Sequence, residues 1–249
     1  MQSRIDLNRF YQGLDDLFHQ KDSRQTMDYL ERWLQEAQHK QDTSGLVAVS
    51  NELGGLCRAM GQIDRAKSLY QNVLVSLEHM GLIHSEHYAT ALINAGDVYV
   101  NSRELPEALQ YFLRARDLLV ECGLAGDYRM AALNNNISMV YRDTGEFDKA
   151  EQALDIAFRI IRGIPECRGE LATTYIRYFT EERKSSPMTD ERRRNMKIVY
   201  GNLAYDLDTL VRERQLEEAG AMPERKAQPK ERRYVAGVMA GKWADDAWN

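Results

Sequence analysis

Apolar and polar side chains along residues 131–157 follow a pattern that predicts two helices joined by a turn. In the stretch AALNNNISMVYRDTGEFDKAEQALDIA, Leu133, Ile137 and Val140 recur every three or four residues, and a second helical pattern follows DTGEF. Three consecutive asparagines, at positions 134–136, interrupt the first pattern. Asparagine is a poor helix former because its side chain competes for nearby backbone groups. We therefore expect a reason other than helix propensity for these amides.

The same two-helix pattern recurs along the chain with a period of 42 residues. Three alanines are spaced by this interval, and each is followed four residues later by a large side chain. Small residues recur twelve residues before each alanine. We expect the small residues to let two antiparallel helices approach closely while the large side chains fill the seam between them. The alanines are Ala66, Ala108 and Ala150, the large residues Tyr70, Phe112 and Leu154, and the small residues Gly54, Gly96 and Ser138.

This spacing resembles the tetratricopeptide repeat, whose pattern is W-x2-L-G-x2-Y followed by A-x3-F. The copy that fits the pattern best consists of Leu92, Ala95, Gly96 and Tyr99, followed by Ala108 and Phe112. The 42-residue period is longer than the family's usual repeat of about 34 residues, and it resembles the long repeats of kinesin light chains. The resemblance covers residues 46–163. The first-position tryptophan of the pattern is absent.

The resemblance implies an all-α fold, a right-handed superhelical solenoid of antiparallel helix pairs. We expect residues 1–45 to form a degenerate N-terminal helical repeat or cap, with helices over 7–20 and 24–40. Three repeats would then follow. A fourth helix pair with a long final helix would come next, and the chain would end in a charged linker and an amphipathic tail. The corresponding ranges are 46–167, 168–220 and 221–249.

The resemblance also implies where a partner would bind, because in this family the first helix of each pair lines a concave groove. Amides can pair with the backbone of an extended peptide, and arginines suit carboxylates. The groove would hold a peptide main chain and read acidic side chains. The candidate binding residues at the family's contact positions are Asn51, Arg58, Asn94, Asp97, Asn101, Asn135, Asn136, Arg142 and Arg177.

A structural interpretation of the asparagines stays open beside the binding one. Asn94 and Asn136 are equivalent in the repeat, and an amide at their position could bond to the neighbouring repeat instead of a ligand. Asn134 occupies the position of the family's tryptophan, which favours a structural role for it.

The composition bounds the class of function. The chain has 249 residues, 43% of them hydrophobic, which is enough for a sizeable core. Its 33 basic and 38 acidic side chains give a net charge of −5, which argues against nucleic acid as the main partner. The three cysteines form no CxxC pair, and no apolar leader or membrane span is evident. We expect a cytoplasmic protein with no membrane partner.

Other candidate chemistry is weak. His79, His84, Glu86 and His87 could provide zinc ligands, but they span a turn, so ordinary loop histidines are the favoured interpretation. No phosphate-binding loop, nucleophile with a base, or paired acid and base is recognisable. The basic run at 192–194 is typical of a solvated helix face. We predict no catalytic residue, no metal and no cofactor, and therefore no enzyme.

The C-terminal tail permits three interpretations. It could cap the last repeat, bind a separate partner, or dock into the groove of its own chain. Trp243 and Trp248 are its candidate anchors, because exposed tryptophans are typical of interfaces.

The sequence thus predicts a non-catalytic scaffold or adaptor that binds a peptide or protein segment in a concave groove. The alternative is a signalling regulator whose repeats sense a peptide and change conformation when it binds. The class of partner is a protein or peptide in both cases.

Overall fold

The structure is a computed structural model, and it describes residues 4–20 and 22–164. Within these ranges the ordered elements are eight α-helices joined by short turns, so the all-α fold is confirmed. The helices form four consecutive pairs. Their bounds are α1 Leu7–Gln20, α2 Ser23–His39, α3 Thr43–Ala59, α4 Ile63–His79, α5 Glu86–Asn101, α6 Leu105–Glu121, α7 Tyr128–Asp143 and α8 Phe147–Arg162.

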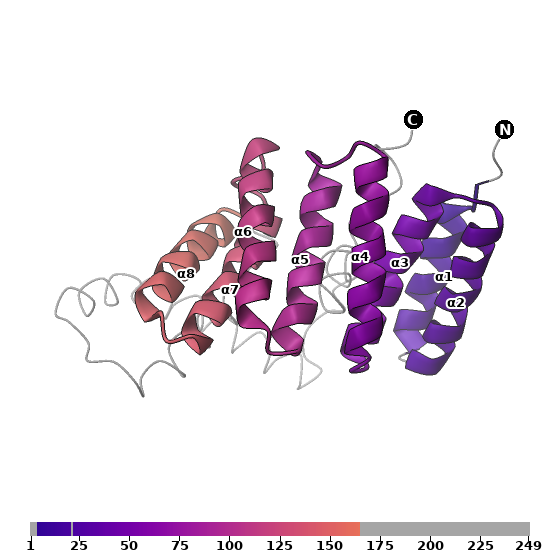
Figure 1. The fold of residues 1–249 in the computed structure, drawn as a ribbon, viewed down its shortest axis with the longest axis horizontal. Helices are drawn as coiled ribbons and strands as arrows, with labels where there is room; N and C mark the ends of the chain where they lie inside the picture. The colour runs from indigo at the N-terminus through magenta and orange to yellow at the C-terminus, as the bar shows by residue number, and fades with distance from the viewer. Residues whose placement is uncertain (1–3, 21, 165–249) are drawn as a thin grey trace, which may run out of the picture.

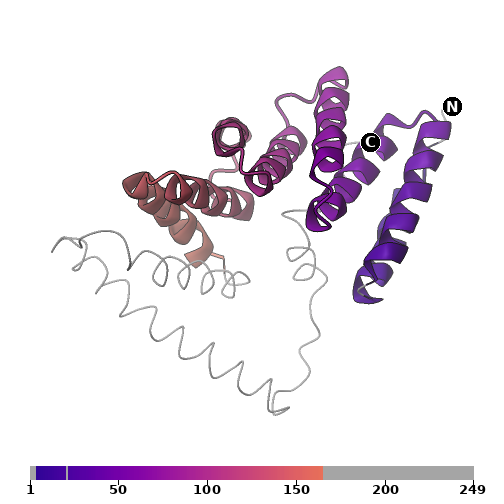
Figure 2. The same ribbon diagram turned by 60° about the horizontal axis from the view of Figure 1, so that its bottom comes forward.

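The helices stand side by side in one row, which runs from the indigo end at α1 to the orange end at α8 (Figure 1). Each helix packs against the helices before and after it, and α5 also contacts α3 and α7 directly. The second helices α4, α6 and α8 are more widely separated from one another. The row therefore bends, as Figure 2 shows, with α3, α5 and α7 on its inner side.

A close contact between a glycine and an aromatic ring lies inside the α3–α4 pair and inside the α5–α6 pair. A Cβ added at Gly54 would lie 2.8 Å from the Tyr70 ring, and one at Gly96 would lie 2.4 Å from the Phe112 ring. Phe112 is fully buried, and burial of such a side chain stabilises a fold by about 1.5–3 kcal/mol. The seam predicted from the 42-residue spacing is confirmed at these two pairs.

The first pair repeats the same contact. Gly13 of α1 faces Tyr29 of α2, where a Cβ would lie 2.4 Å from the tyrosine oxygen. Both residues precede their counterparts in the second pair by 41 residues. Helices α1 and α2 are thus built like the later pairs, and they lie where the sequence predicted helices.

The turn inside each later pair has one residue with positive φ. Gly61 has a φ of 75°, Arg103 a φ of 64° and Gly145 a φ of 80°, and these residues are 42 positions apart. First helices begin at side-chain caps: the side chains of Asp42, Ser85 and Asp127 accept hydrogen bonds from backbone N–H groups in the first turns of α3, α5 and α7. These caps satisfy donors that a helix start leaves without partners.

Some predicted elements lie outside the described residues. They are the helix pair at 168–220 and the linker and tail at 221–249.

Candidate functional site

Successive first helices carry polar residues at helical spacing on the side where these helices meet. In α5 the residues are Asn94, Asp97 and Asn101, separated by three and four positions. Asn51 and Arg58 of α3 are seven positions apart, as are Asn135 and Arg142 of α7. Residues spaced in this way share one stripe of a helix. We call the surface formed by these stripes of α3, α5 and α7 the inner face.

A buried pair of amides joins α3 to α5 on the inner face. The Asn94 side-chain nitrogen donates a hydrogen bond of 2.8 Å to the side-chain oxygen of Asn51. The two residues are only 6% and 4% exposed, so each amide supplies a partner that the other needs in the absence of water. Asn51 also accepts a bond of 3.2 Å at its backbone oxygen from the hydroxyl of Tyr70. The bond between the two amides connects the second helix pair to the third, whereas the Tyr70 bond lies within the second pair.

An equivalent bond joins α5 to α7. The Asn136 side-chain nitrogen donates to the carboxylate of Asp97 over 2.7 Å. Asn94 and Asn136 occupy equivalent repeat positions, and both reach back to the preceding first helix. The link to a neighbouring repeat that the sequence left open is therefore present for both amide nitrogens.

Asn134 bonds within its own helix. Its side-chain nitrogen donates to the carbonyl oxygen of Met130 over 2.8 Å, and the residue is 1% exposed. Such a bond to the preceding turn satisfies a buried amide. Asn134 has the structural role that its position favoured.

Asp97 is a partly buried acid at the centre of the inner face. Burial raises the pKa of its carboxyl to about 7, because removal from water disfavours the charged form, and the nearby Arg58 guanidinium opposes this rise. Arg58 is itself partly buried. Within the described residues, its guanidinium has no carboxylate within ion-pair distance and donates no hydrogen bond.

The remaining candidates occupy different environments. Asn101 is exposed at the end of α5, and Asn135 is partly buried in α7. Arg142 is bonded to the neighbouring Asp143 over 2.9 Å and 3.1 Å. Three candidates lie outside the described residues: Arg177, Trp243 and Trp248. The assignment of all these residues to partner binding stays a prediction.

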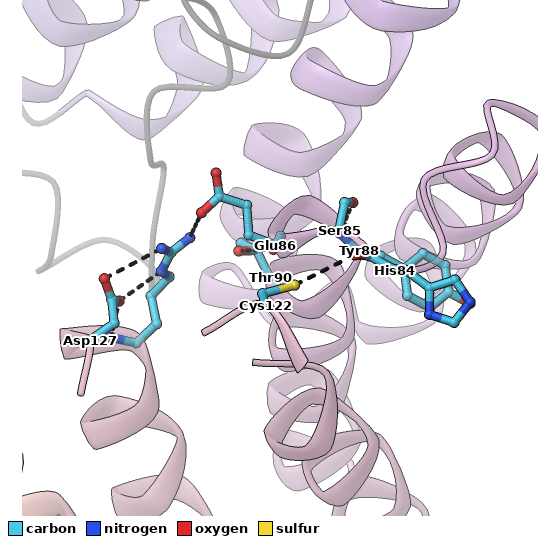
Figure 3. Close-up of polar contacts among 8 residues, drawn as sticks. His84, Ser85, Glu86, Tyr88, Thr90, Cys122 and Asp127 are labelled. Carbon is cyan, nitrogen blue, oxygen red and sulfur yellow. Dashed lines mark hydrogen bonds and ion pairs between the residues drawn. The ribbon is translucent and has the colours of Figure 1, made fainter. Parts of the chain in front are cut away.

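The histidine-containing segment before α5 is held by bonds between pairs. Figure 3 shows Glu86 at the start of α5 and Asp127 at the start of α7, and Arg129 bonds to both, over 2.7 Å each. Cys122 contacts the carbonyl oxygen of His84 over 3.5 Å.

Each polar side chain of this segment is in a different setting. His84 is exposed beside Glu121, and burial lowers the pKa of His87. Over residues 4–20 and 22–164, no group of three His, Cys, Asp or Glu side chains is arranged to hold a metal ion. The contacts of His84 with Cys122 and of Glu86 with Arg129 join this segment to the following helix pairs.

Two structural features were missed in the sequence. The Gly13–Tyr29 contact could have been found by extending the repeat alignment toward the N-terminus, since the spacing persists at 41 residues. The Arg129–Glu86 ion pair spans 43 residues, close to one repeat, but many charged pairs have that separation. The spacing alone therefore could not distinguish the Arg129–Glu86 ion pair from the other charged pairs with a similar separation.

Comparison with known proteins identifies the class of repeat. Residues 131–162, which include most of α7 and α8, match the family described as tetratricopeptide repeat. The crystal structure of BtubC (BKLC) from P. vanneervenii is similar with a TM-score of 0.61 and 21% identity, over 89% of this chain and 85% of that one. The crystal structure of MamA is similar with a TM-score of 0.44 and 18% identity, over 66% of this chain and 82% of that one. No curated protein sequence matches the chain.

Residues 131–162 thus match a tetratricopeptide repeat, and the described helix pairs have a fold similar to that of BtubC. Repeats of this kind are in general protein-interaction scaffolds, and they are typically non-catalytic. None of the described helices has the length and apolar character needed to span a membrane.

Proposed function

We propose that the inner face binds an extended segment of a partner protein. The observation that carries this proposal is the arrangement of α3, α5 and α7 along one side of the row, with a stripe of polar side chains on each of these helices. The class of repeat supports the proposal, because solenoids of stacked helix pairs present long concave surfaces to their ligands.

The contacts within the inner face divide its residues into two groups. Asn51, Asn94 and Asn136 bond to neighbouring helices, so they position the helices that line the face. Arg58 and Asn101 are accessible and have no such bond. We assign these two residues to partner contact, together with Asn135 and Arg142. Arg177 belongs to the same proposal from its repeat position.

The two arginines favour a partner segment that contains carboxylates. A guanidinium presents several N–H donors in one plane, which matches a carboxylate well. Arg58 has no carboxylate within ion-pair distance in the described part of the chain, so a ligand could supply one. Asn101 and Asn135 could pair with the ligand backbone whatever its sequence.

Site-specific photo-crosslinking tests the proposal. A photoreactive residue at position 101 would lie at the end of α5 on the inner face, and one at position 120 would lie on α6, where Val120 is 56% exposed. After irradiation in a native lysate, we expect a discrete crosslinked protein at position 101 and none at position 120. Addition of the Arg58→Ala change should weaken the crosslink, and Arg116→Ala on α6 should leave it unchanged. Equal crosslinking from both positions would contradict inner-face binding.

A regulatory variant of this function is the second candidate. The bonds Asn51–Asn94 and Asp97–Asn136 each connect adjacent helix pairs, so a ligand that altered either would change how the pairs sit together. Hydrogen exchange of the free and the crosslinked protein distinguishes the two functions. A pure scaffold should gain protection at the contacted helices alone, whereas a sensor should also change at helices that the ligand does not touch.

Docking of the C-terminal tail is part of the proposal as a competing ligand. Removal of residues 221–249 should strengthen the crosslink at position 101 if the tail occupies the inner face. An unchanged crosslink would assign the tail to capping or to a separate partner.

A further inference from the structure

Polar bonds join the parallel helices α5 and α7 near both ends and at the middle. Each bond connects a side chain of α5, or of the turn that follows it, to a side chain of α7. We call these three bonds the α5–α7 ties. They run from Arg129 to Glu86 over 2.7 Å, from Asn136 to Asp97 over 2.7 Å, and from Arg103 to Asp143 over 3.2 Å.

The α5–α6 and α7–α8 pairs are held together in two different ways. Helices α5 and α7 approach each other at few points, whereas α6 packs against both of them. Buried apolar residues of α6 and α7, such as Leu119 and Leu133, belong to one core cluster. A rotation of the α7–α8 pair about the α6–α7 contact would therefore keep this apolar contact and would stretch the α5–α7 ties.

The connection between the two pairs is suited to such a rotation. It runs from Cys122 to Asp127 and contains two glycines. An added Cβ at Gly126 would meet no atom within 4 Å, so packing does not fix the backbone at this point. The equivalent position in the connection before α5 is occupied by His84. Glycine adopts more backbone conformations than any other residue, so the connection before α7 can change its conformation more easily.

The preceding junction, between the α3–α4 and α5–α6 pairs, has uncharged groups at the equivalent place. The amides of Asn94 and Asn51 bond to each other there, and both residues are buried. An ion pair between Lys67 and Glu104 also crosses this junction, but it joins α4 to the residue before α6. Its loss would not release α5 from α3. Because salt screens charges and has little effect on buried neutral amides, the two junctions should respond differently to salt.

We propose that the joint between the α5–α6 and α7–α8 pairs is a hinge, held closed by the α5–α7 ties and released by ionic strength. With the ties intact, α7 is held against α5 and the row bends at this joint (Figure 2). When the ties weaken, the α7–α8 pair rotates about the α6–α7 contact, so α7 moves away from α5 and α8 approaches α6. This inference concerns the chain without a ligand, and it does not require the proposed function.

Arg129 is the most firmly placed member of the α5–α7 ties. Its side chain is 20% exposed, and it contacts the carboxylates of Glu86 and Asp127 over 2.7 Å each, as the guanidinium in Figure 3 shows. The side chain of Arg103 is 79% exposed, and ion pairs in such a setting contribute little. Screening acts beyond about 10 Å at about 0.1 M salt and beyond about 3 Å at about 1 M salt. The higher concentration should therefore weaken the charged ties.

Distances between pairs of spin labels test the hinge. Ser68, Gln110 and Gln152 are exposed residues at equivalent repeat positions on α4, α6 and α8. A nitroxide attached to p-acetylphenylalanine at two of these positions leaves the natural cysteines of the full chain in place. Double electron–electron resonance between positions 110 and 152 then reports on the proposed hinge. The distance between positions 68 and 110 reports on the preceding junction.

We expect the distance between positions 110 and 152 to shorten and its distribution to broaden when salt rises from about 0.1 M to about 1 M. A rotation of about 10° over the roughly 10 Å between packed helix axes would shift the distance by about 2 Å. The distance between positions 68 and 110 should stay the same.

Three variants assign the change to the ties. Arg129→Gln and Glu86→Ala should each shorten the distance between positions 110 and 152 at low salt. Glu86→Ala leaves the bonds between Arg129 and Asp127 in place, so its effect cannot come from a disturbed start of α7. Arg159→Gln is the matched control, because Arg159 bonds to a backbone oxygen of its own helix, and it should leave the distance unchanged.

The possible results separate the hinge from other effects of salt. An unchanged distance between positions 110 and 152 at both salt concentrations would overturn the inference. Equal changes in both distances would assign the effect to the whole row and would also overturn it. A change in Arg129→Gln without one in Glu86→Ala would place the effect in the first turn of α7 and would exclude the ties as its cause.

Discussion

The side-chain nitrogen of Asn94 donates a 2.8 Å hydrogen bond to the side-chain oxygen of Asn51, and both residues are buried where two helix pairs meet. A buried amide with a partner contributes modestly to stability, whereas one left without a partner is costly. The bond therefore fixes how α3 and α5 sit on the inner face, where the accessible residues Arg58 and Asn101 also lie.

Removal of this bond should destabilise the chain. Asn94→Ala leaves the Asn51 oxygen buried without its donor, and we expect the free energy of unfolding to fall by about 1–3 kcal/mol. Asn101→Ala removes an exposed amide of the same helix and should change the free energy of unfolding by less than about 0.5 kcal/mol. Urea denaturation of both variants checks this prediction. A smaller loss for Asn94→Ala than for Asn101→Ala would show that the bond is unimportant for folding.

Two neighbouring glycines of α3 should respond in opposite directions to alanine. A Cβ at Gly54 would lie 2.8 Å from the ring of Tyr70, whose hydroxyl is held by the backbone oxygen of Asn51. The ring cannot retreat without loss of that bond, so Gly54→Ala should cost about 1–3 kcal/mol. A Cβ at Gly55 would lie 3.5 Å from the Tyr70 hydroxyl, an ordinary contact.

Gly55→Ala should therefore stabilise the helix by about 0.5–1 kcal/mol, because alanine loses less backbone entropy on folding. Thermal unfolding followed by circular dichroism measures both effects. Equal shifts of the melting temperature in the two variants would contradict the close glycine–tyrosine contact.

The turns inside the pairs offer a test of backbone strain. Gly145 has a φ of 80° and open space around its Cα, so Gly145→Ala should cost about 1 kcal/mol through conformation alone. Arg103 occupies the equivalent position with a φ of 64° and pairs with Asp143. Arg103→Gly should relieve the backbone strain, but it also removes an exposed ion pair and raises the conformational entropy of the unfolded chain. Because these effects oppose one another, the free energy of unfolding should stay within about 0.5 kcal/mol of that of the unmodified chain. A large loss in Arg103→Gly would show that the ion pair outweighs the strain.

The pKa of Asp97 predicts how stability depends on pH. Burial raises this pKa from 3.8 to about 7, so the folded state binds a proton that the unfolded state has released between these values. Stability due to the protonated acid is present below about pH 4 and is lost as the pH rises through about 7. Asp97→Asn should therefore gain stability relative to the unmodified chain as the pH rises.

We expect this gain to be about 1–2 kcal/mol larger at about pH 8 than at about pH 5, allowing for the partial exposure of the group. Asp148→Asn, at an exposed position of α8, is the control and should show no such difference. Urea denaturation at the two pH values provides the measurement. A pH-independent difference would place the pKa of Asp97 near that of an ordinary aspartate.

The helix pairs could be predicted from the sequence because the contact between the two helices of a pair depends on one small residue and one aromatic ring. Gly96 permits the approach of Phe112, and the same combination recurs in Gly54 with Tyr70. Such pairs repeat at a constant interval, and the interval is visible without any structure. The turns were predictable for the same reason, although Arg103 at a position of positive φ was not, because arginine carries no signal for that conformation.

The partners of the polar side chains could not be predicted in the same way. Asn94 bonds to Asn51, but Asn136 at the equivalent position bonds to Asp97, because the preceding helix offers a different acceptor in each case. The choice depends on the rotation of one helix pair relative to the next and on small differences in distance. The raised pKa of Asp97 follows from its burial, which the sequence does not state.

The seam between Gly96 and Phe112 also bears on how such a chain can lengthen. The close contact inside a helix pair recurs after 42 residues, from Gly54 and Tyr70 to Gly96 and Phe112, so a duplicated segment of that length would carry both halves of this contact. A tandem copy could therefore enter the row without any new complementary surface having to arise. Growth by whole units, followed by divergence of single side chains such as Asn51 and Asp97, would explain why the scaffold is regular while its polar inner face differs from one unit to the next.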